Sequence, residues 1–241
     1  MPAMTLDDIR SQTRDVIDID TSDISDTVLN RIIGQGYDTI AYSEKRWPFY
    51  ETETTFQTVA GTSDYTLATI GASVTQGIRD LISIRDDDHV MTYIGRDEGD
   101  RDNPLNVSTS SDPWEWSFWN DTVRFYPTPD SVETIHVRCV RYPTDFPSSA
   151  TSAAGSETPD LPNPFHPVLT TYTIAKAYLQ QEDPVMSNQY MQQYAMELDN
   201  VARRYADAPA PQPMIANSRT STRYMIGTGQ LRYASTGGVR W

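Results

Sequence analysis

The spacing of the apolar residues changes twice along this chain, and this change constrains the fold more than any other feature. In residues 5–45 and again in 166–207, apolar residues recur every three or four positions, which is the period of an amphipathic helix. Between them, in residues 51–142, apolar residues alternate every second position, as in strands that bury one face. We therefore predict an α+β protein in which N- and C-terminal helices form one helical bundle with an inserted antiparallel β lobe.

Breaks in these patterns divide the chain into five segments. Residues 1–49 are expected to supply the N-terminal helices of the bundle, because Trp47, Pro48 and Phe49 end the helical period and Pro48 disfavours a helical residue before it. The Pro-rich stretch 208–213 likewise excludes further helix and favours polyproline geometry. The other predicted segments are an inserted β lobe at 50–142, a linker at 143–163, C-terminal helices at 164–207 and an extended C-terminal arm at 208–241.

Local signals mark particular points in the helices. Thr5, followed by acidic residues, is a typical N-cap, and Pro184 is expected to open the last helix. The second helix should begin near residue 23 or 25 and continue to about Lys45. Gly34 and Gly36 lie inside it, where each costs about 1 kcal/mol relative to alanine. We therefore expect another helix to pack closely against these glycines.

The β lobe is predicted to be built from hairpins. Alternating residues at 54–58 are expected to pair with 65–67, and the strand at 78–85 with 89–94. A further hairpin is expected at 114–126, folded at Asn120 and Asp121, before a last strand at 133–142. The polar stretch at 95–113 is predicted to be a long exposed loop.

The sequence offers little for catalysis or for metal binding. The only cysteine, Cys139, excludes a disulfide or a zinc knuckle, and its place among alternating apolar residues predicts a core-facing strand position. The three histidines lack metal-ligand spacing, and neither a phosphate-binding loop nor a nucleophile elbow is present. We therefore predict a protein that is not an enzyme, with no catalytic residue, no cofactor and no metal site.

Two acidic clusters leave alternatives open. The run from Asp86 to Asp88 could bind a divalent cation, but it lacks the spaced ligands of a calcium loop and is interpreted as a solvated turn. The segment 97–102 could serve a hydrolase through residues such as Asp97 and Asp100. Because arginines are interleaved with these carboxylates, we interpret it as a solvated or protein-contacting loop.

Aromatic residues are concentrated in one predicted hairpin of the β lobe. By alternation, three of them share one face of a strand, which is the pattern of a strand buried on one side. A core or subunit interface is favoured, and a platform for stacking sugars is the alternative. These interface candidates are Trp114, Trp116, Phe118 and Trp119.

Charge is distributed unevenly along the chain. The first 207 residues contain 15 of the 19 basic side chains and all 33 acidic ones, whereas the last 34 contain four arginines and no acidic residue. An acidic body repels the phosphate backbone, so a conventional DNA-gripping surface is not expected. No apolar run is long enough to span a bilayer, and residues 1–20 lack the pattern of a signal peptide.

The C-terminal arm combines these arginines with aromatic and aliphatic residues among glycines and threonines. Tyr, Arg and Trp are the residue types that carry most interface energy, so we expect the arm to order on a partner rather than remain a solvated terminus. The candidate docking residues are Arg219, Arg223, Tyr224, Met225, Ile226, Leu231, Arg232, Tyr233, Arg240 and Trp241.

The order of these elements resembles that of a known family. A helix pair ending in Trp47-Pro48-Phe49, the predicted hairpin at 54–67, the segment 120–129 with the sequence NDTVRFYPTP, and Leu161-Pro162 before two closing helices are similar to the head-to-tail adaptor proteins of tailed bacteriophages. The likeness is strongest to the tubular adaptors of short-tailed phages and covers about residues 5–207 in element order.

The resemblance implies a structural virion protein that forms a ring, twelvefold by analogy, below the portal. The helical bundle would contribute to the ring wall, the β lobe would meet the nozzle or another tail protein, and residues 208–241 would dock on the portal. The ring would form part of the DNA ejection channel, through which the genome passes without specific binding. A carbohydrate-binding or tail-fibre-type module using the Trp-rich hairpin is the alternative function.

Overall fold

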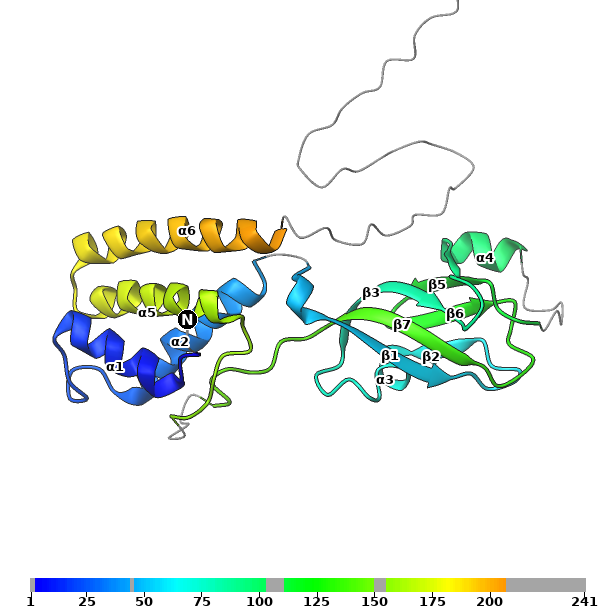
Figure 1. Ribbon diagram of the computed structural model, residues 1–241, viewed down its shortest axis with the longest axis horizontal. Coiled ribbons are helices and arrows are strands. Elements are labelled where there is room, and N and C mark those ends of the chain that lie inside the picture. Colours follow the sequence, from blue (N-terminus) through cyan, green and yellow to red (C-terminus); the bar gives the residue numbers. More distant parts are fainter. Residues whose placement is uncertain (1–2, 44–45, 103–110, 150–154, 207–241) are drawn as a thin grey trace, which may run out of the picture.

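The computed structural model describes residues 3–43, 46–102, 111–149 and 155–206. The molecule is elongated, with helices from both ends of the chain at one end and the strands at the other (Figure 1). The predicted α+β class is confirmed, with N- and C-terminal helices on either side of the strands in the chain.

Two helices precede the strands. Helix α1 (Leu6–Ile17) begins with the predicted Thr5 cap, which forms a capping box with Asp8. Helix α2 (Asp26–Ala41) ends before the predicted Lys45, so this boundary was placed too late. The indole Nε1 of Trp47 donates to the carbonyl of Ile40 at 3.1 Å, so the chain folds back over the end of α2. The short 3₁₀ helix η1 (Pro48–Tyr50) then leads into the strands.

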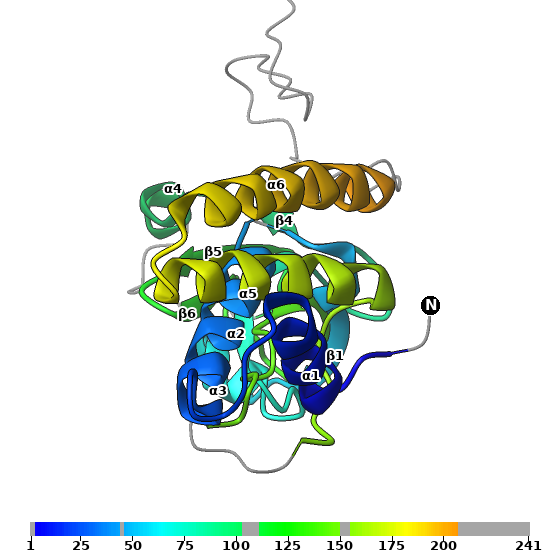
Figure 2. The ribbon, with the colours of Figure 1, turned by 90° about the vertical axis from the view of Figure 1, so that its left-hand side faces the viewer.

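Two helices follow the strands. After the 3₁₀ helix η2 (Asn163–Phe165), helix α5 (His166–Gln180) lies between the N-terminal helices and helix α6 (Pro184–Ala206), as Figure 2 shows. Helix α5 is buried along most of its length because α1, α2 and α6 all pack against it. The predicted start of α6 is confirmed, and the carboxylate of Asp183 accepts from two backbone amides of its first turn.

The two glycines of α2 have different neighbours. A Cβ at Gly36 would lie 2.5 Å from the ring of Tyr172 and 2.8 Å from Leu169, both on α5, so the predicted close approach of another helix is confirmed there. A Cβ at Gly34 would instead face the carbonyl of Phe146 at 3.4 Å. At Gly34 the predicted helix contact is therefore wrong, because the segment after the strands covers that side of α2.

The strands form two sheets that face each other across a second core. The first sheet has the antiparallel order β1-β7-β3, and the second has the order β2-β6-β5-β4. Their shared core contains Cys139, at its predicted inward position, together with apolar residues of both sheets. The strands are β1 (Glu51–Gln57), β2 (Asp64–Thr66), β3 (Ile78–Arg85), β4 (Thr92–Tyr93), β5 (Glu115–Trp119), β6 (Thr122–Tyr126) and β7 (Thr134–Arg141), with the short helix α3 (Leu67–Ile70) after β2.

Strand positions were predicted better than strand partners. The hairpin β5–β6 is confirmed, with Asn120 and Asp121 both at positive φ, as a tight two-residue turn requires. The hairpin expected between 54–58 and 65–67 is wrong, because β1 pairs with the distant β7 and β2 pairs with β6. The chain after β3 makes one bridge back to it, and β4 then pairs with β5 in parallel.

Two segments predicted as irregular have more structure than expected. The stretch expected to be a loop at 95–113 contains helix α4 (Arg96–Asp102), in which Arg96 and Asp100 pair one turn apart at 3.7 Å. The ring of Tyr126 lies close against the backbone at Gly99, which leaves no room for a side chain there. The segment 143–163, predicted to be a linker, also contributes the buried Phe146 and Leu161 to the helical core.

An ion pair joins the end of β7 to the segment that leads back to the helices. The guanidinium of Arg141 donates to both carboxylate oxygens of Asp160, at 2.7 and 2.9 Å. The backbone carbonyl of Asp160 accepts from the hydroxyl of Tyr50, and the hydroxyl of Tyr37 donates to the carbonyl of Thr144. Burial acts to raise the pKa of Asp160, but hydrogen bonds from Arg141 and Thr144 outweigh it, so this pKa lies below its usual value.

We predict that Asp160→Asn destabilises the protein at neutral pH by about 1–2 kcal/mol, because one charge-assisted bond to Arg141 is lost in a partly exposed place. A carboxyl group with a lowered folded-state pKa stabilises the fold above its unfolded pKa and loses that effect as pH falls through the folded value. The difference between the wild type and the variant should therefore shrink as pH falls below about 4. Urea unfolding at a series of pH values measures this difference in the free energy of unfolding.

The matched control is Asp145→Asn, which removes an exposed carboxyl group from the same segment. This control should change the free energy of unfolding by less than about 0.5 kcal/mol at any pH. An equal effect of both substitutions would contradict a special role for the Arg141–Asp160 pair.

Candidate interaction surfaces

Trp47, Pro48 and Phe49 lie where the helices meet the strands. Trp47 is buried and stacks on Phe49, with ring centroids 5.3 Å apart, and it meets the edge of Phe165 at the same distance. Phe49 also contacts Tyr205 near the end of α6, at 5.6 Å. This aromatic cluster therefore places the C-terminal end of α6 beside the entry to the β lobe.

The four predicted interface aromatics of the β lobe are not equivalent. Trp116 is buried in the core between the sheets, whereas Trp114 is 55% exposed and Trp119 is 66% exposed. Phe118 pairs with Val123 and alternates onto the same face as Trp116, but its side chain is 37% exposed. Trp119 is next to it in sequence and therefore on the outer face.

Tyr93 belongs with these aromatics but was missed by sequence reasoning. It is half exposed, and its ring meets Trp116 edge-on with centroids 4.8 Å apart. The parallel pairing of β4 with β5 places it there, and a two-residue edge strand gives too short a pattern to reveal such a partner. Tyr93 and Trp114 are thus two exposed aromatic residues on the neighbouring strands β4 and β5 or directly before them.

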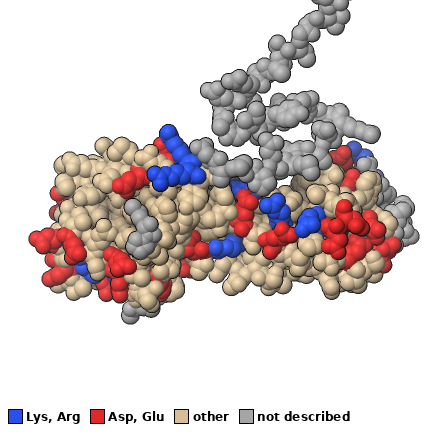
Figure 3. All heavy atoms as spheres, in the orientation of Figure 1, with Lys and Arg blue, Asp and Glu red and all other residues tan. Residues whose placement is uncertain are grey.

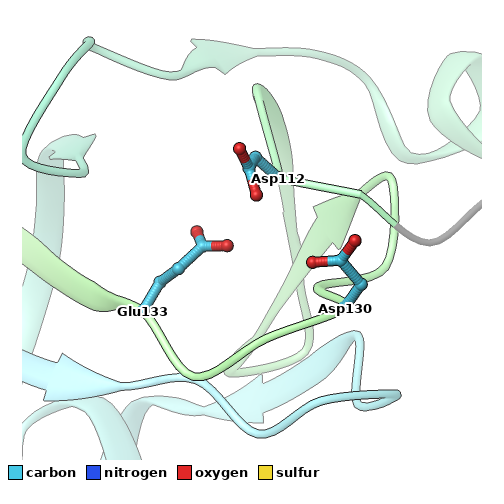
Figure 4. Close-up of side chains that lie close together, drawn as sticks. All are labelled: Asp112, Asp130 and Glu133. Atoms are coloured by element: carbon cyan, nitrogen blue, oxygen red, sulfur yellow. The ribbon is translucent and has the colours of Figure 1, made fainter.

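An acidic cluster near Trp114 was also missed. The carboxylates of Asp112, Asp130 and Glu133 each offer an oxygen within 4.8 Å of the others, and Figure 4 shows them pointing toward one another. Asp112 precedes β5, and the other two lie between β6 and β7. Their sequence separation matches no ligand motif, so only the fold reveals the cluster.

The electrostatics of this cluster are unfavourable. Burial and the nearby carboxylates of Asp112 and Asp86 raise the pKa of Glu133 above its ordinary value, despite a hydrogen bond from Ser131 that acts to lower it. Among the described residues, no Lys or Arg forms an ion pair with the three carboxylates. Negative charge is therefore concentrated here without a cationic side chain to offset it.

The two acidic clusters seen in the sequence are held by hydrogen bonds and ion pairs. In the turn after β3, the carboxylate of Asp86 accepts from the backbone amides of Asp88 and His89, and Asp87 bonds to His136 at 2.9 Å. These contacts are those of a turn that caps itself.

In α4, Asp100 accepts hydrogen bonds from Arg124 at 2.9 Å and from Tyr126 at 2.8 Å. Arg124 also donates to both carboxylate oxygens of Asp64. Burial acts to raise the pKa of Asp100, but these bonds outweigh it and leave the pKa below its usual range. Asp100 thereby fastens α4 to the outer face of the second sheet, while Asp97 is exposed.

The predicted docking residues of the C-terminal arm all lie outside the described residues. They are Arg219, Arg223, Tyr224, Met225, Ile226, Leu231, Arg232, Tyr233, Arg240 and Trp241. Within the described part of the chain, no helix is both long enough and apolar enough to cross a membrane.

Comparison with known proteins identifies the family. Residues 4–215 match the SU10 adaptor protein family, a stretch that includes both the helices and the sheets. The chain therefore belongs to the SU10 adaptor family and is a structural adaptor protein of bacteriophage virions. An adaptor contacts other structural proteins of the phage and belongs to the neck of the virion. No curated protein matches the chain significantly.

We predict that the two neighbouring tryptophans of β5 respond differently to truncation. Trp116→Ala should lower the free energy of unfolding by about 3–5 kcal/mol, because it empties space between the sheets. Trp119→Ala should change it by no more than about 0.5 kcal/mol, because its side chain is mostly exposed. Thermal and urea unfolding compare the two variants, and a large loss of stability in the Trp119 variant would show that this side chain packs in the core.

Proposed function

We propose that this chain is the subunit of a closed ring, twelvefold by analogy, that joins the portal to the nozzle or another tail protein. The ring would form part of the genome ejection channel, in the neck of the virion, after assembly in the host cytoplasm. The observation that carries the proposal is membership of the SU10 adaptor family, because the match spans nearly all of the described chain.

The charge distribution supports a role in the channel. The first 207 residues contain 15 basic and 33 acidic side chains, and acidic residues are prominent on the face shown in Figure 3. A negative wall repels the phosphate backbone, so DNA can pass without being bound. The four arginines of the arm, by contrast, suit a protein surface that presents carboxylates.

The elongated form suggests how the subunit divides its contacts. We infer that the helices contribute to the ring wall, that the β lobe meets the next tail component, and that residues 208–241 dock on the portal. The exposed aromatics Trp114 and Trp119 support a contact surface on the β lobe, since aromatic residues are enriched in protein interfaces. They would then be covered in the assembled virion.

We predict that removing residues 208–241 abolishes binding to the portal while the remaining body stays folded. The helices and sheets have their own cores, formed by residues before 207, so the truncated chain should keep its unfolding transition. Native mass spectrometry of the purified chain, alone and with the portal ring, measures both the ring and the complex. A stoichiometric complex that survives the truncation would contradict portal docking by the arm.

Two full-length variants distinguish the effect of the arm's charge on portal binding from the effect of removing the arm. Changing the arm's four arginines to glutamine should weaken portal binding, because their bidentate contacts are lost. Changing Thr220, Thr222, Thr228 and Thr236 to alanine alters as many arm positions and should leave binding unchanged. Equal binding by the two variants would show that the arginines do not mediate docking.

The exposed tryptophans favour one alternative, a carbohydrate-binding or tail-fibre-type module. Trp114 and Trp119 present aromatic surface to solvent, and such surfaces stack on sugar rings as well as on proteins. This function needs no ring and no portal.

A glycan array tests the alternative. If the β lobe binds sugars, the wild-type chain should give a signal that is lost in Trp114→Ala and Trp119→Ala, because stacking surface is removed. The control is Val59→Ala, which trims an exposed apolar residue in the segment between β1 and β2. Binding no stronger than background for the wild type would eliminate this function.

A further inference from the structure

We propose that, in the free subunit, the C-terminal arm docks on its own β lobe, on the surface formed by Tyr93, Trp114 and the carboxylates of Asp112, Asp130 and Glu133. We call this the aromatic–acidic surface. The inference does not depend on the portal assignment, since it concerns the isolated subunit.

The members of this surface are brought together by backbone pairing. The amide of Ser111 donates to the carbonyl of Thr128, and that of Trp114 donates to Tyr126, so the chain before β5 runs beside the end of β6. Asp112 lies within the stretch before β5. Asp130 lies just after the end of β6 that runs beside this stretch. The amide of Thr92 donates to the carbonyl of Trp114, which adds Tyr93 at the open edge of the sheet.

This surface has two features that favour an occupant. Tyr93 and Trp114 are 54% and 55% exposed, and aromatic side chains with this much exposed area gain free energy when they are covered. The adjoining carboxylates repel one another and have no ion pair with a described Lys or Arg, so a cation among them would be stabilised. Figure 3 shows acidic side chains gathered toward this end of the molecule.

The arm has the complementary chemistry. It contains four arginines and no acidic residue, and three of the four are adjacent to an aromatic or aliphatic residue, in the stretches 223–226, 231–233 and 239–241. A guanidinium can pair with a carboxylate through its edge while its face stacks on an aromatic ring. The same segment therefore satisfies both halves of the aromatic–acidic surface.

The position of the arm's origin allows this contact. Helix α6 ends at Ala206, and Tyr205 lies 5.6 Å from Phe49, next to the start of β1. The arm thus begins near the base of the β lobe, and its 34 residues could span at most about 115 Å when extended. A tethered segment has an effective concentration in the millimolar range, which favours the subunit's own arm over that of a second copy in dilute solution.

Docking of the arm would keep the aromatic–acidic surface covered until assembly. The arm would leave the β lobe when a tighter partner becomes available, and the exposed aromatics would then be free for a neighbouring protein. The arm would thereby couple its own binding to a partner with the uncovering of the aromatic residues on the β lobe.

Hydrogen–deuterium exchange on the full-length chain tests the proposal. Amides in 90–94 and 111–119 should exchange about fivefold more slowly in the full-length protein than in a chain ending at residue 207, because the docked arm protects the edge. The difference should vanish in 0.5 M salt, where exposed ion pairs are screened, and should not change on tenfold dilution. Peptides from α2 and α5 serve as internal controls.

Full-length variants keep the test independent of truncation. Replacing the four arm arginines with glutamine should raise exchange at 90–94 and 111–119 to the truncated rate, whereas alanine at Thr220, Thr222, Thr228 and Thr236 should not. Equal exchange in the full-length and truncated chains would overturn the proposal. Protection that weakens on dilution would assign the arm to a second copy, and protection that survives the loss of all four arginines would refute their pairing with the carboxylates.

Discussion

The junction between the helices and the β lobe depends on the ion pair between Arg141 and Asp160, which ties the end of β7 to the chain that returns to the helices. Arg141 is the last residue of β7, the central strand of its sheet, and its guanidinium also lies over the ring of Tyr50, 5.2 Å from the centroid. The backbone around this ion pair is also hydrogen-bonded to η1 through Tyr50, and to α2 through Tyr37, which donates to the carbonyl of Thr144. Strand, helix and returning chain therefore meet in one network of charged and neutral hydrogen bonds, which fixes how the two parts are oriented.

Two of the separate apolar cores formed by the described residues adjoin this junction. One lies between the helices and includes Val140 and Phe146, while the other lies between the two sheets and includes Val137 and Cys139. Adjacent positions of β7 thus face different cores, because side chains alternate along a strand. Such a division lets each part change its surface without repacking the other.

Much of the fold could be predicted from the sequence, and the misses share a physical cause. Periodicity and caps located Thr5, the start of α6 and the turn at Asn120, because these depend on residues near in sequence. The pairing of β1 with β7 and the acidic cluster at Asp112 depend on contacts between distant segments, which a period of two does not specify. Helix α4 was missed because its stability comes from Arg124 and Tyr126, which lie beyond the segment itself. The docking role of the arm stays a prediction, drawn from its composition and from the family resemblance.

The chain enters the β lobe along β1 and leaves it along β7, and these two strands are hydrogen-bonded neighbours over seven paired positions. A pull between helices and sheets would therefore act along the strand axes instead of across them. Loaded in this direction, the hydrogen bonds between β7 and β3 resist sliding together, whereas a peeling force would break them one after another. The connection between the two parts is therefore loaded along its strands, the direction in which paired strands resist separation together.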